Sequence, residues 1–303
     1  MTMMDQETFL NLPTEEVAEL VRAVGPQVCV FPLNGTRRWF LLEHADKVQN
    51  TDTQTYVDKI VKGYIETYRL CFTYGLDTLL SPVFGGELFS RGDEYIKMTV
   101  DGISRVATDP GFLAFYQEHQ VRVRFYGDYR KQFSGTPFAY MIDLFDDAMN
   151  QTAHNDRYRL FYGVFGNDAT ETIAEISVEH FQKTGTIPSR RKLVEQYYGE
   201  YVDAATLFIG FDKFSVFDYP LLGLGRENLY FTVAPSLYLS DTQLRTILYD
   251  HIYLRQVEEP GYANMTKEDF LWMKNFYQVN HEHTQGIGKI AGNIWYPIAQ
   301  VVE

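Results

Sequence analysis

The apolar positions of this chain follow two different periods. Between Thr53 and Tyr74 apolar residues recur at spacings of three and four, which predicts one buried face on a helix of roughly six turns. Shorter apolar runs that end in glycine, proline or a polar residue are typical of buried strands. On this basis we predict strands at residues 27–31, 77–84, 121–128, 160–166, 206–211 and 229–233.

Helical patterns separate these strands along most of the chain. They cover residues 15–23, 53–74, 93–106, 137–150, 168–184, 189–201 and 244–255. Because strands and helices alternate, we predict an α/β fold with a mainly parallel central sheet flanked by helices. Residues 256–303 show a mixed pattern. We interpret them as a C-terminal extension that packs on the domain formed by residues 1–255 or on a dimer partner.

One strand end carries an unusual set of residues. The strand at 27–31 leads into a turn through Pro32 and Gly35, followed directly by Arg37 and Arg38. Ligands of parallel α/β sheets bind outside the carboxyl ends of the strands. Backbone N–H groups in such a turn can face an anion, and guanidinium groups match phosphate oxygens. This stretch therefore predicts a site for a phosphorylated ligand.

The net charge of the chain indicates that the anion site is confined to this loop and does not extend over the surface. The chain has 27 Lys and Arg against 40 Asp and Glu, a net charge of −13, which argues against binding to nucleic acid or to an anionic membrane. Two arginines in such an acidic chain point to a small anionic ligand. Aromatic residues make up 16% of the chain, and they indicate either an aromatic core or a pocket whose ring faces stabilise a cation.

Several other classes of protein are not indicated. The sequence has no P-loop, no HExxH zinc motif and no GxSxG nucleophile motif. Cys29 and Cys71 lie in apolar runs, which predicts buried free thiols and a reducing, cytoplasmic location. No apolar stretch approaches the ~20 residues of a membrane span, and the first residues lack a signal-peptide pattern.

The arginine loop also carries a family resemblance. Asn34-Gly35-Thr36-Arg37-Arg38-Trp39 resembles the Asp-Gly-Asn-Arg-Arg-Trp signature of cis-prenyltransferases, whose loop binds an allylic diphosphate. Residues 81–91 stand where that family has a second substrate loop, and residues 207–215 and 228–231 are similar to its late strands. Further blocks resemble most closely a branch of the family that processes diterpenyl diphosphates, and they lie at 125–129, 164–169, 198–203 and 247–255.

The resemblance implies a homodimer with a cis-prenyltransferase-like fold and a specific chemistry. The expected substrate is a bicyclic C20 diterpenyl diphosphate of the kolavenyl or tuberculosinyl type, supplied by an upstream class II diterpene cyclase. Ionisation followed by addition of water would make a diterpene alcohol, and transfer to adenosine is the alternative. A non-catalytic partner subunit is disfavoured because the arginine loop is intact. Chain elongation is disfavoured because Gly210-Phe211 and Asn228 replace an arginine and a metal-binding glutamate of the family.

The resemblance also implies roles for individual residues. Tyr56, Arg37 and Arg38 are expected to act in catalysis together with the residue at position 34. Trp39, Tyr56 and Trp295 are candidates for shielding the cation. The groups expected to hold the diphosphate are Gly35, Thr36, Arg37, Arg38, Arg91, Lys213 and Ser215.

Position 34 departs from the family. The family carries an aspartate here, which can bind Mg²⁺ or accept a proton, whereas the amide of Asn34 does neither well. The resemblance therefore implies Mg²⁺, but Asn34 does not supply the carboxylate that would bind it. Two interpretations are open: either the acid has been replaced so that the protein is inactive, or the enzyme works without it.

Overall fold

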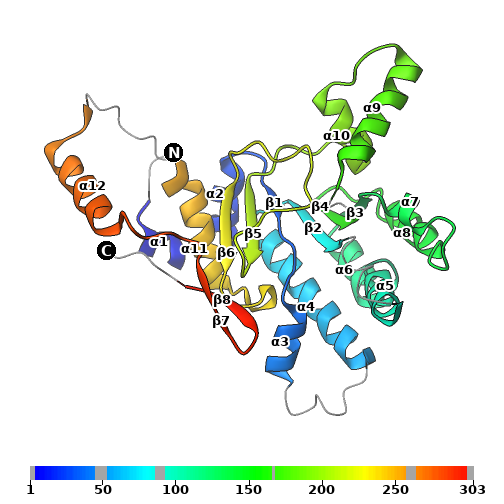
Figure 1. Cartoon of the computed structure of the whole chain (residues 1–303), viewed down its shortest axis with the longest axis horizontal. Helices are drawn as coiled ribbons and strands as arrows, with labels where there is room; N and C mark the ends of the chain where they lie inside the picture. The colour runs from blue at the N-terminus through cyan, green and yellow to red at the C-terminus, as the bar shows by residue number, and fades with distance from the viewer. Residues whose placement is uncertain (1–3, 45–52, 86–92, 166–167, 257–263, 299–303) are drawn as a thin grey trace.

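A six-stranded parallel sheet forms the centre of the molecule (Figure 1). The computed structural model describes residues 4–44, 53–85, 93–165, 168–256 and 264–298. The strand order is β3-β4-β2-β1-β5-β6, and every neighbouring pair is parallel. The predicted α/β fold with a parallel sheet is thus confirmed. The strands are β1 (Val28–Val30), β2 (Thr78–Phe84), β3 (Val121–Tyr126), β4 (Tyr158–Val164), β5 (Leu207–Phe211) and β6 (Asn228–Thr232).

Both faces of the sheet are buried, as parallel sheets require. Successive side chains point to opposite faces, so Cys29 packs in one hydrophobic core while Val28 and Val30 pack in the other. The second core is closed by α10 (Arg190–Tyr198) and by parts of the segment 201–222. The larger core is covered by α1 (Gln6–Asn11), α2 (Thr14–Ala23), α4 (Thr53–Thr73), α5 (Asp93–Thr108), α6 (Pro110–Glu118), α8 (Tyr140–Gln151) and α11 (Asp241–Ile252).

Four short helices were not predicted from periodicity: α1, α3 (Thr36–Glu43), α6 and α7 (Tyr129–Phe133). None has a long apolar stripe, and only two have a side-chain N-cap: Asp5 caps α1 and Asp109 caps α6, whereas α3 and α7 have none. Asp109 caps α6 by accepting a hydrogen bond from the Gly111 N–H, and Pro110 occupies the first turn. The predicted helix at 168–184 begins two residues later, as α9 (Thr170–Thr184), because Asp168 lies outside the helix and accepts from the Thr170 N–H.

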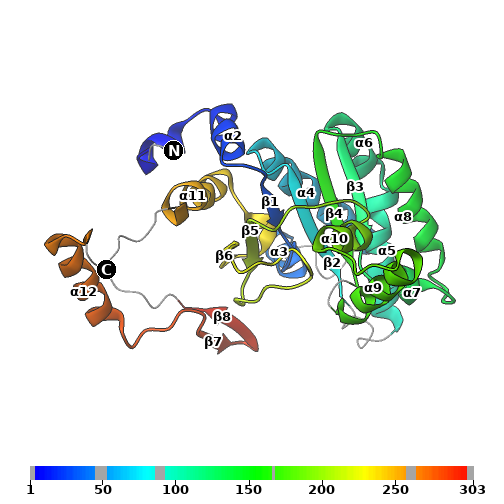
Figure 2. The same cartoon turned by 90° about the horizontal axis from the view of Figure 1, so that it is seen from above.

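The C-terminal part forms elements of its own. Helix α12 (Lys267–Asn280) begins with a capping box between Thr266 and Asp269, and β7 (Gly288–Ala291) pairs antiparallel with β8 (Ile294–Pro297). Figures 1 and 2 both show α12 set apart from the six-stranded sheet. Several of its large side chains are exposed: Phe270, Leu271, Trp272, Phe276, Tyr277 and Val279. The division of the chain at residue 255 remains a prediction.

Both cysteines are buried and unpaired, which confirms the thiol interpretation. Burial raises the pKa of the Cys71 thiol to about 12, so it stays protonated at neutral pH. Among the helices in the described ranges, none combines the length and apolar character needed to cross a membrane.

Candidate functional site

The arginine loop lies at the carboxyl end of β1, where it leads directly into α3. Gly35 adopts a left-handed conformation with φ of 76° and precedes Thr36, the first residue of the helix. The first N–H groups of a helix have no partner within it, and they attract anions together with the helix dipole. Arg37 and Arg38 therefore project from the first turn of a helix instead of from the open turn predicted by the sequence.

Gly35 is packed too closely to carry a side chain. A Cβ atom there would lie 2.7 Å from the Phe211 ring and 3.1 Å from Cβ of Pro235. The left-handed φ and this contact both require glycine. The loop is also fixed from the other side, because the Asn34 N–H donates to Oγ of Ser236 at 3.1 Å and the Ser236 N–H donates to the Asn34 carbonyl at 3.1 Å. The turn is thus held rigidly between β5 and the segment after β6.

The two arginines have different surroundings. Arg37 is exposed and forms no ion pair with any residue that the structure describes. Arg38 donates from Nη1 to Oδ2 of Asp212 at 2.8 Å, and its guanidinium carbon lies 5.3 Å from the Phe211 ring centroid. Asp212 follows β5 directly and is only 7% exposed. It is a site residue that the sequence analysis missed, although its place at a strand end is a signal that could have found it.

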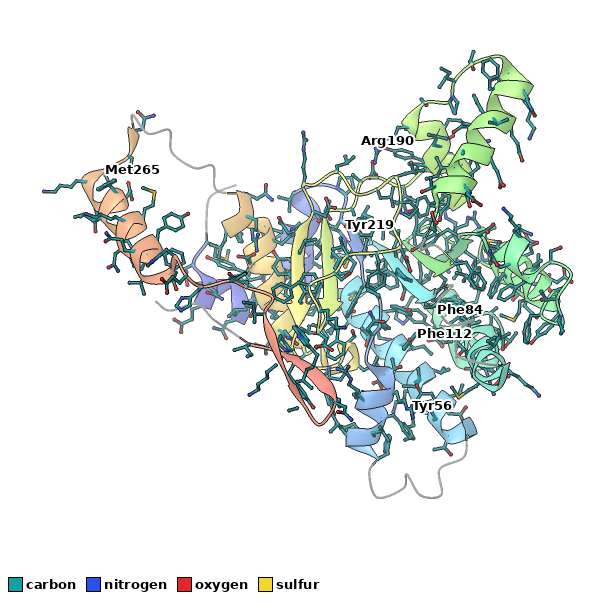
Figure 3. All side chains as sticks on the ribbon, viewed as in Figure 1. Tyr56, Phe84, Phe112, Arg190, Tyr219 and Met265 are labelled. Atoms are coloured by element: carbon teal, nitrogen blue, oxygen red, sulfur yellow. The ribbon has the colours of Figure 1, made fainter. Side chains whose placement is uncertain are left out.

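A cavity of about 280 Å³ opens beside this loop. It is lined by α4 from Tyr56 to Tyr64 and by α5 from Met98 to Val106. Each of these stretches is about 12 Å long. Most of the lining residues of α4 and α5 are apolar, and Asn34 and Thr36 of the loop add polar groups. Phe112, labelled with Tyr56 in Figure 3, contributes from α6. The lining residues are Leu33, Asn34, Gly35, Thr36, Tyr56, Val57, Ile60, Val61, Tyr64, Val83, Met98, Thr99, Gly102, Ile103, Val106 and Phe112.

Two tyrosines of α4 connect this cavity to the loop. The hydroxyl of Tyr56 lies 3.4 Å from Oγ1 of Thr36, and the hydroxyl of Tyr64 donates to the Leu33 carbonyl at 3.3 Å. Burial raises the pKa of Tyr64 well above its usual value, so its ring stays neutral. Tyr64 was predicted only as part of the apolar helix face. Its position two turns after Tyr56 is the signal that places both rings on one side of α4.

The other predicted residues are spread more widely. Lys213 and Ser215 are exposed on the loop that follows β5, next to Asp212. Trp39 packs edge-on against His44, and Trp295 packs across Gly288 inside the β7–β8 hairpin. Neither tryptophan is among the residues that line the cavity. Arg91 falls outside the described residues.

The donor set at the loop does not fit a resident Mg²⁺ ion. Asn34 offers only an amide, and the neighbouring carboxylate of Asp212 is engaged by Arg38. In the described part of the chain, no group of three His, Cys, Asp or Glu residues is arranged to hold a metal. The Mg²⁺ implied by the family is therefore not assigned to residues here, and no chemical step is derived through it.

Asn228, which the resemblance suggests in place of a metal-binding glutamate, lies elsewhere. It begins β6 and pairs in register with Leu207, the first residue of β5, so it sits at the amino edge of the sheet. There its amide contacts Nδ1 of His251 at 2.8 Å, while Nε2 of His251 contacts Oε1 of Gln27 at 2.9 Å. Burial lowers the pKa of His251 to about 4. Asn228 thus belongs to a buried network at the amino ends of the strands, whereas Asn34 lies at their carboxyl ends.

Comparisons with known proteins agree with this geometry. No family model matches the chain. The sequence is 43% identical over 298 residues to tuberculosinyl adenosine transferase of Mycobacterium tuberculosis, covering 98% of this chain and 99% of that protein. It is 25% identical over 301 residues to (+)-kolavelool synthase of Herpetosiphon aurantiacus, covering 96% of this chain and 98% of that one.

Two solved structures share the fold at 14% identity. Lavandulyl diphosphate synthase from Lavandula x intermedia, in complex with dimethylallyl diphosphate, superposes with a TM-score of 0.60 over 82% of this chain and all of its own. A probable undecaprenyl diphosphate synthase from Campylobacter jejuni gives 0.56 over 78% of this chain and 98% of that one. The chain therefore belongs to the diterpenyl-processing branch of the cis-prenyltransferase-like enzymes that includes tuberculosinyl adenosine transferase and (+)-kolavelool synthase.

Proposed function

We propose that this protein ionises a bicyclic C20 diterpenyl diphosphate and transfers the resulting allylic cation to an acceptor. The observation that carries the proposal is the junction of two unlike regions at the Asn34–Arg38 loop. A helix N-terminus with two arginines lies beside a cavity that α4 and α5 line mainly with apolar residues. A substrate with a highly charged head and a hydrocarbon body needs this combination.

The bond changes follow from these surroundings. The allylic C–O bond breaks, and its electron pair leaves with the diphosphate. Arg37, Arg38 and the N–H groups at the start of α3 stabilise the negative charge where it develops. Tyr56 and Tyr64 line the cavity that receives the cation, and aromatic rings can stabilise a cation. Trp39 and Trp295 are weaker candidates for this role because they do not line that cavity.

The acceptor supplies the new bond to carbon and loses a proton. Asn34 cannot take that proton, so we assign it to an oxygen of the released diphosphate, which is the nearest strong base in the complex. Adenosine is the acceptor we favour, because the relative that is 43% identical over almost the whole chain is an adenosine transferase. Water is the second candidate, favoured by the 25% identical (+)-kolavelool synthase. This order reverses the one expected from the sequence.

Two expectations about partners belong to this proposal. An upstream class II diterpene cyclase would supply the bicyclic diphosphate. A homodimer would give the exposed aromatic side chains of α12 a surface on which residues 256–303 can pack. Sedimentation analysis of the full chain, compared with a Trp272→Glu variant, tests this packing: we expect the variant to shift toward monomer, and an unchanged dimer would contradict it.

The function is tested by incubating the full chain with a panel of C20 diphosphates, with and without adenosine. Mass spectrometry should detect a diterpenyl nucleoside in the presence of adenosine, together with stoichiometric release of diphosphate. A diterpene alcohol alone, with adenosine present, would identify water as the acceptor. Release of diphosphate from none of the substrates, even at high protein concentration, would contradict the proposal.

A further inference from the structure

Arg38 forms an ion pair with the carboxylate of Asp212. An acidic side chain thus lies at the place where we propose that an anionic ligand binds. Nη1 of Arg38 lies 2.8 Å from Oδ2 of Asp212, and the Arg38 side chain is still 42% exposed. Asp212 is almost fully buried. A guanidinium has five N–H donors, so Arg38 retains capacity for a second anion on its exposed side. Arg37, by contrast, has no carboxylate partner among the described residues.

The backbone holds Asp212 in an unusual conformation. Its φ is 70°, and its N–H donates to the Thr232 carbonyl at 3.0 Å. Left-handed conformations are costly for residues with a Cβ atom, and they persist at functional sites where the surroundings enforce them. The preceding residue, Phe211, is the one that touches Gly35 of the loop. Asp212 is thereby fixed relative to the start of α3.

We propose that Asp212 is a positioning residue that acts through Arg38 as an internal counterion. It holds the guanidinium at the loop in the ligand-free protein and competes with the diphosphate for it. A bound diphosphate uses the N–H donors on the exposed side of Arg38 and shares the guanidinium charge with Asp212. Because Asp212 and the diphosphate carry charges of the same sign, the carboxylate also limits how tightly the released diphosphate is held. This inference rests on the proposed function of the loop.

Binding of inorganic diphosphate to the full chain, measured by titration calorimetry, tests the competition directly. Asp212→Asn removes the charge but keeps the shape, and asparagine tolerates a left-handed φ. We expect it to bind inorganic diphosphate about three- to tenfold more tightly than the wild type. Asp212→Gly also suits this φ and should tighten binding, so the test does not depend on one variant folding well. Loss of a merely structural contact would weaken binding.

Asp218→Asn is the matched control, because Asp218 lies on the same segment and has a φ of 64°. We expect its affinity for inorganic diphosphate to match the wild type. Unchanged or weaker binding by both folded Asp212 variants would overturn the inference. Failure of the proposed function looks different: inorganic diphosphate would then bind the wild type and an Arg37→Ala variant equally, whatever Asp212 does.

Discussion

Asn34 and Ser236 hold each other by two hydrogen bonds, although 202 positions separate them in the chain. The backbone bond from Ser236 to the Asn34 carbonyl does not depend on either side chain, but the bond from the Asn34 N–H needs the hydroxyl of Ser236. Ser236 is completely buried, so this contact is shielded from water. The start of α3 is thus positioned by a distant segment of the chain.

Ser236→Ala should therefore loosen the loop. We expect the free energy of unfolding to fall by about 1 kcal/mol. We also expect kcat to fall, because the loop that positions the substrate is looser, while KM changes less. Chemical denaturation and steady-state kinetics measure the two effects. Ser177→Ala is the control, because that hydroxyl donates only to a carbonyl within α9. Turnover equal to the wild type in Ser236→Ala would argue against a positioning role.

Arg37→Ala tests the diphosphate contact itself. Removal of one charged donor from a developing anion lowers turnover by about 10²–10³. Arg37→Lys keeps the charge without the fork geometry and should recover only part of that loss. The chain offers a second double arginine as a control, Arg190-Arg191 on α10, where Arg191 stacks 4.1 Å from the Tyr201 ring centroid. Similar losses in Arg37→Ala and Arg191→Ala would mean that the effect is not specific to the loop.

Gly102 tests the cavity. It lies within α5, lines the cavity, and a Cβ atom placed on it would meet nothing within 4 Å. Gly102→Ala should raise the free energy of unfolding by roughly 0.5–1 kcal/mol with little change in kinetics. Gly102→Phe fills the space, and we expect kcat/KM for C20 diphosphates to fall about tenfold or more. Wild-type kinetics in Gly102→Phe would place the hydrocarbon elsewhere.

The His251 network predicts a pH dependence of stability. Burial lowers the folded-state pKa of His251 to about 4, below its value in the unfolded chain, so the unfolded state binds more protons between these values. Stability should therefore fall as the pH drops from about 6.5 to 4, by up to about 3 kcal/mol. Denaturant unfolding across this range measures the slope. We expect His251→Gln to flatten it; the exposed His154→Gln is the control, and equal slopes in all three proteins would contradict the assignment.

The fold was largely predictable because its strands and long helices carry strong local patterns. The helix at 53–74 and the six strands were located to within a few residues by periodicity alone. The loop at 34–39 was found because glycine, adjacent arginines and a strand end occur together. Its helical continuation was not found, since α3 begins at a glycine with no side-chain cap.

The remaining site residues depend on contacts that no local pattern encodes. Ser236 and Asp212 reach the loop from the other half of the chain, and only the strand order brings β5 beside β1. Asn228 shows the converse, because the motif suggested that it replaces a metal-binding glutamate, whereas its register puts it at the amino edge of the sheet, away from the loop. The motif at the loop indicated an anion site, and the strand order of the sheet determines which distant residues contact it.

The most direct test of the central claim is the activity of Asn34→Asp beside the wild type on the same C20 diphosphates. The acid would lie just before α3, where a negative charge is favourable, so the variant should fold as well as the wild type. It restores a group that can accept a proton or bind Mg²⁺. We predict that product formation, read by mass spectrometry, rises by orders of magnitude. Equal activity of the two proteins would show that the reaction does not need an acid at position 34, and it would contradict the role inferred for this position.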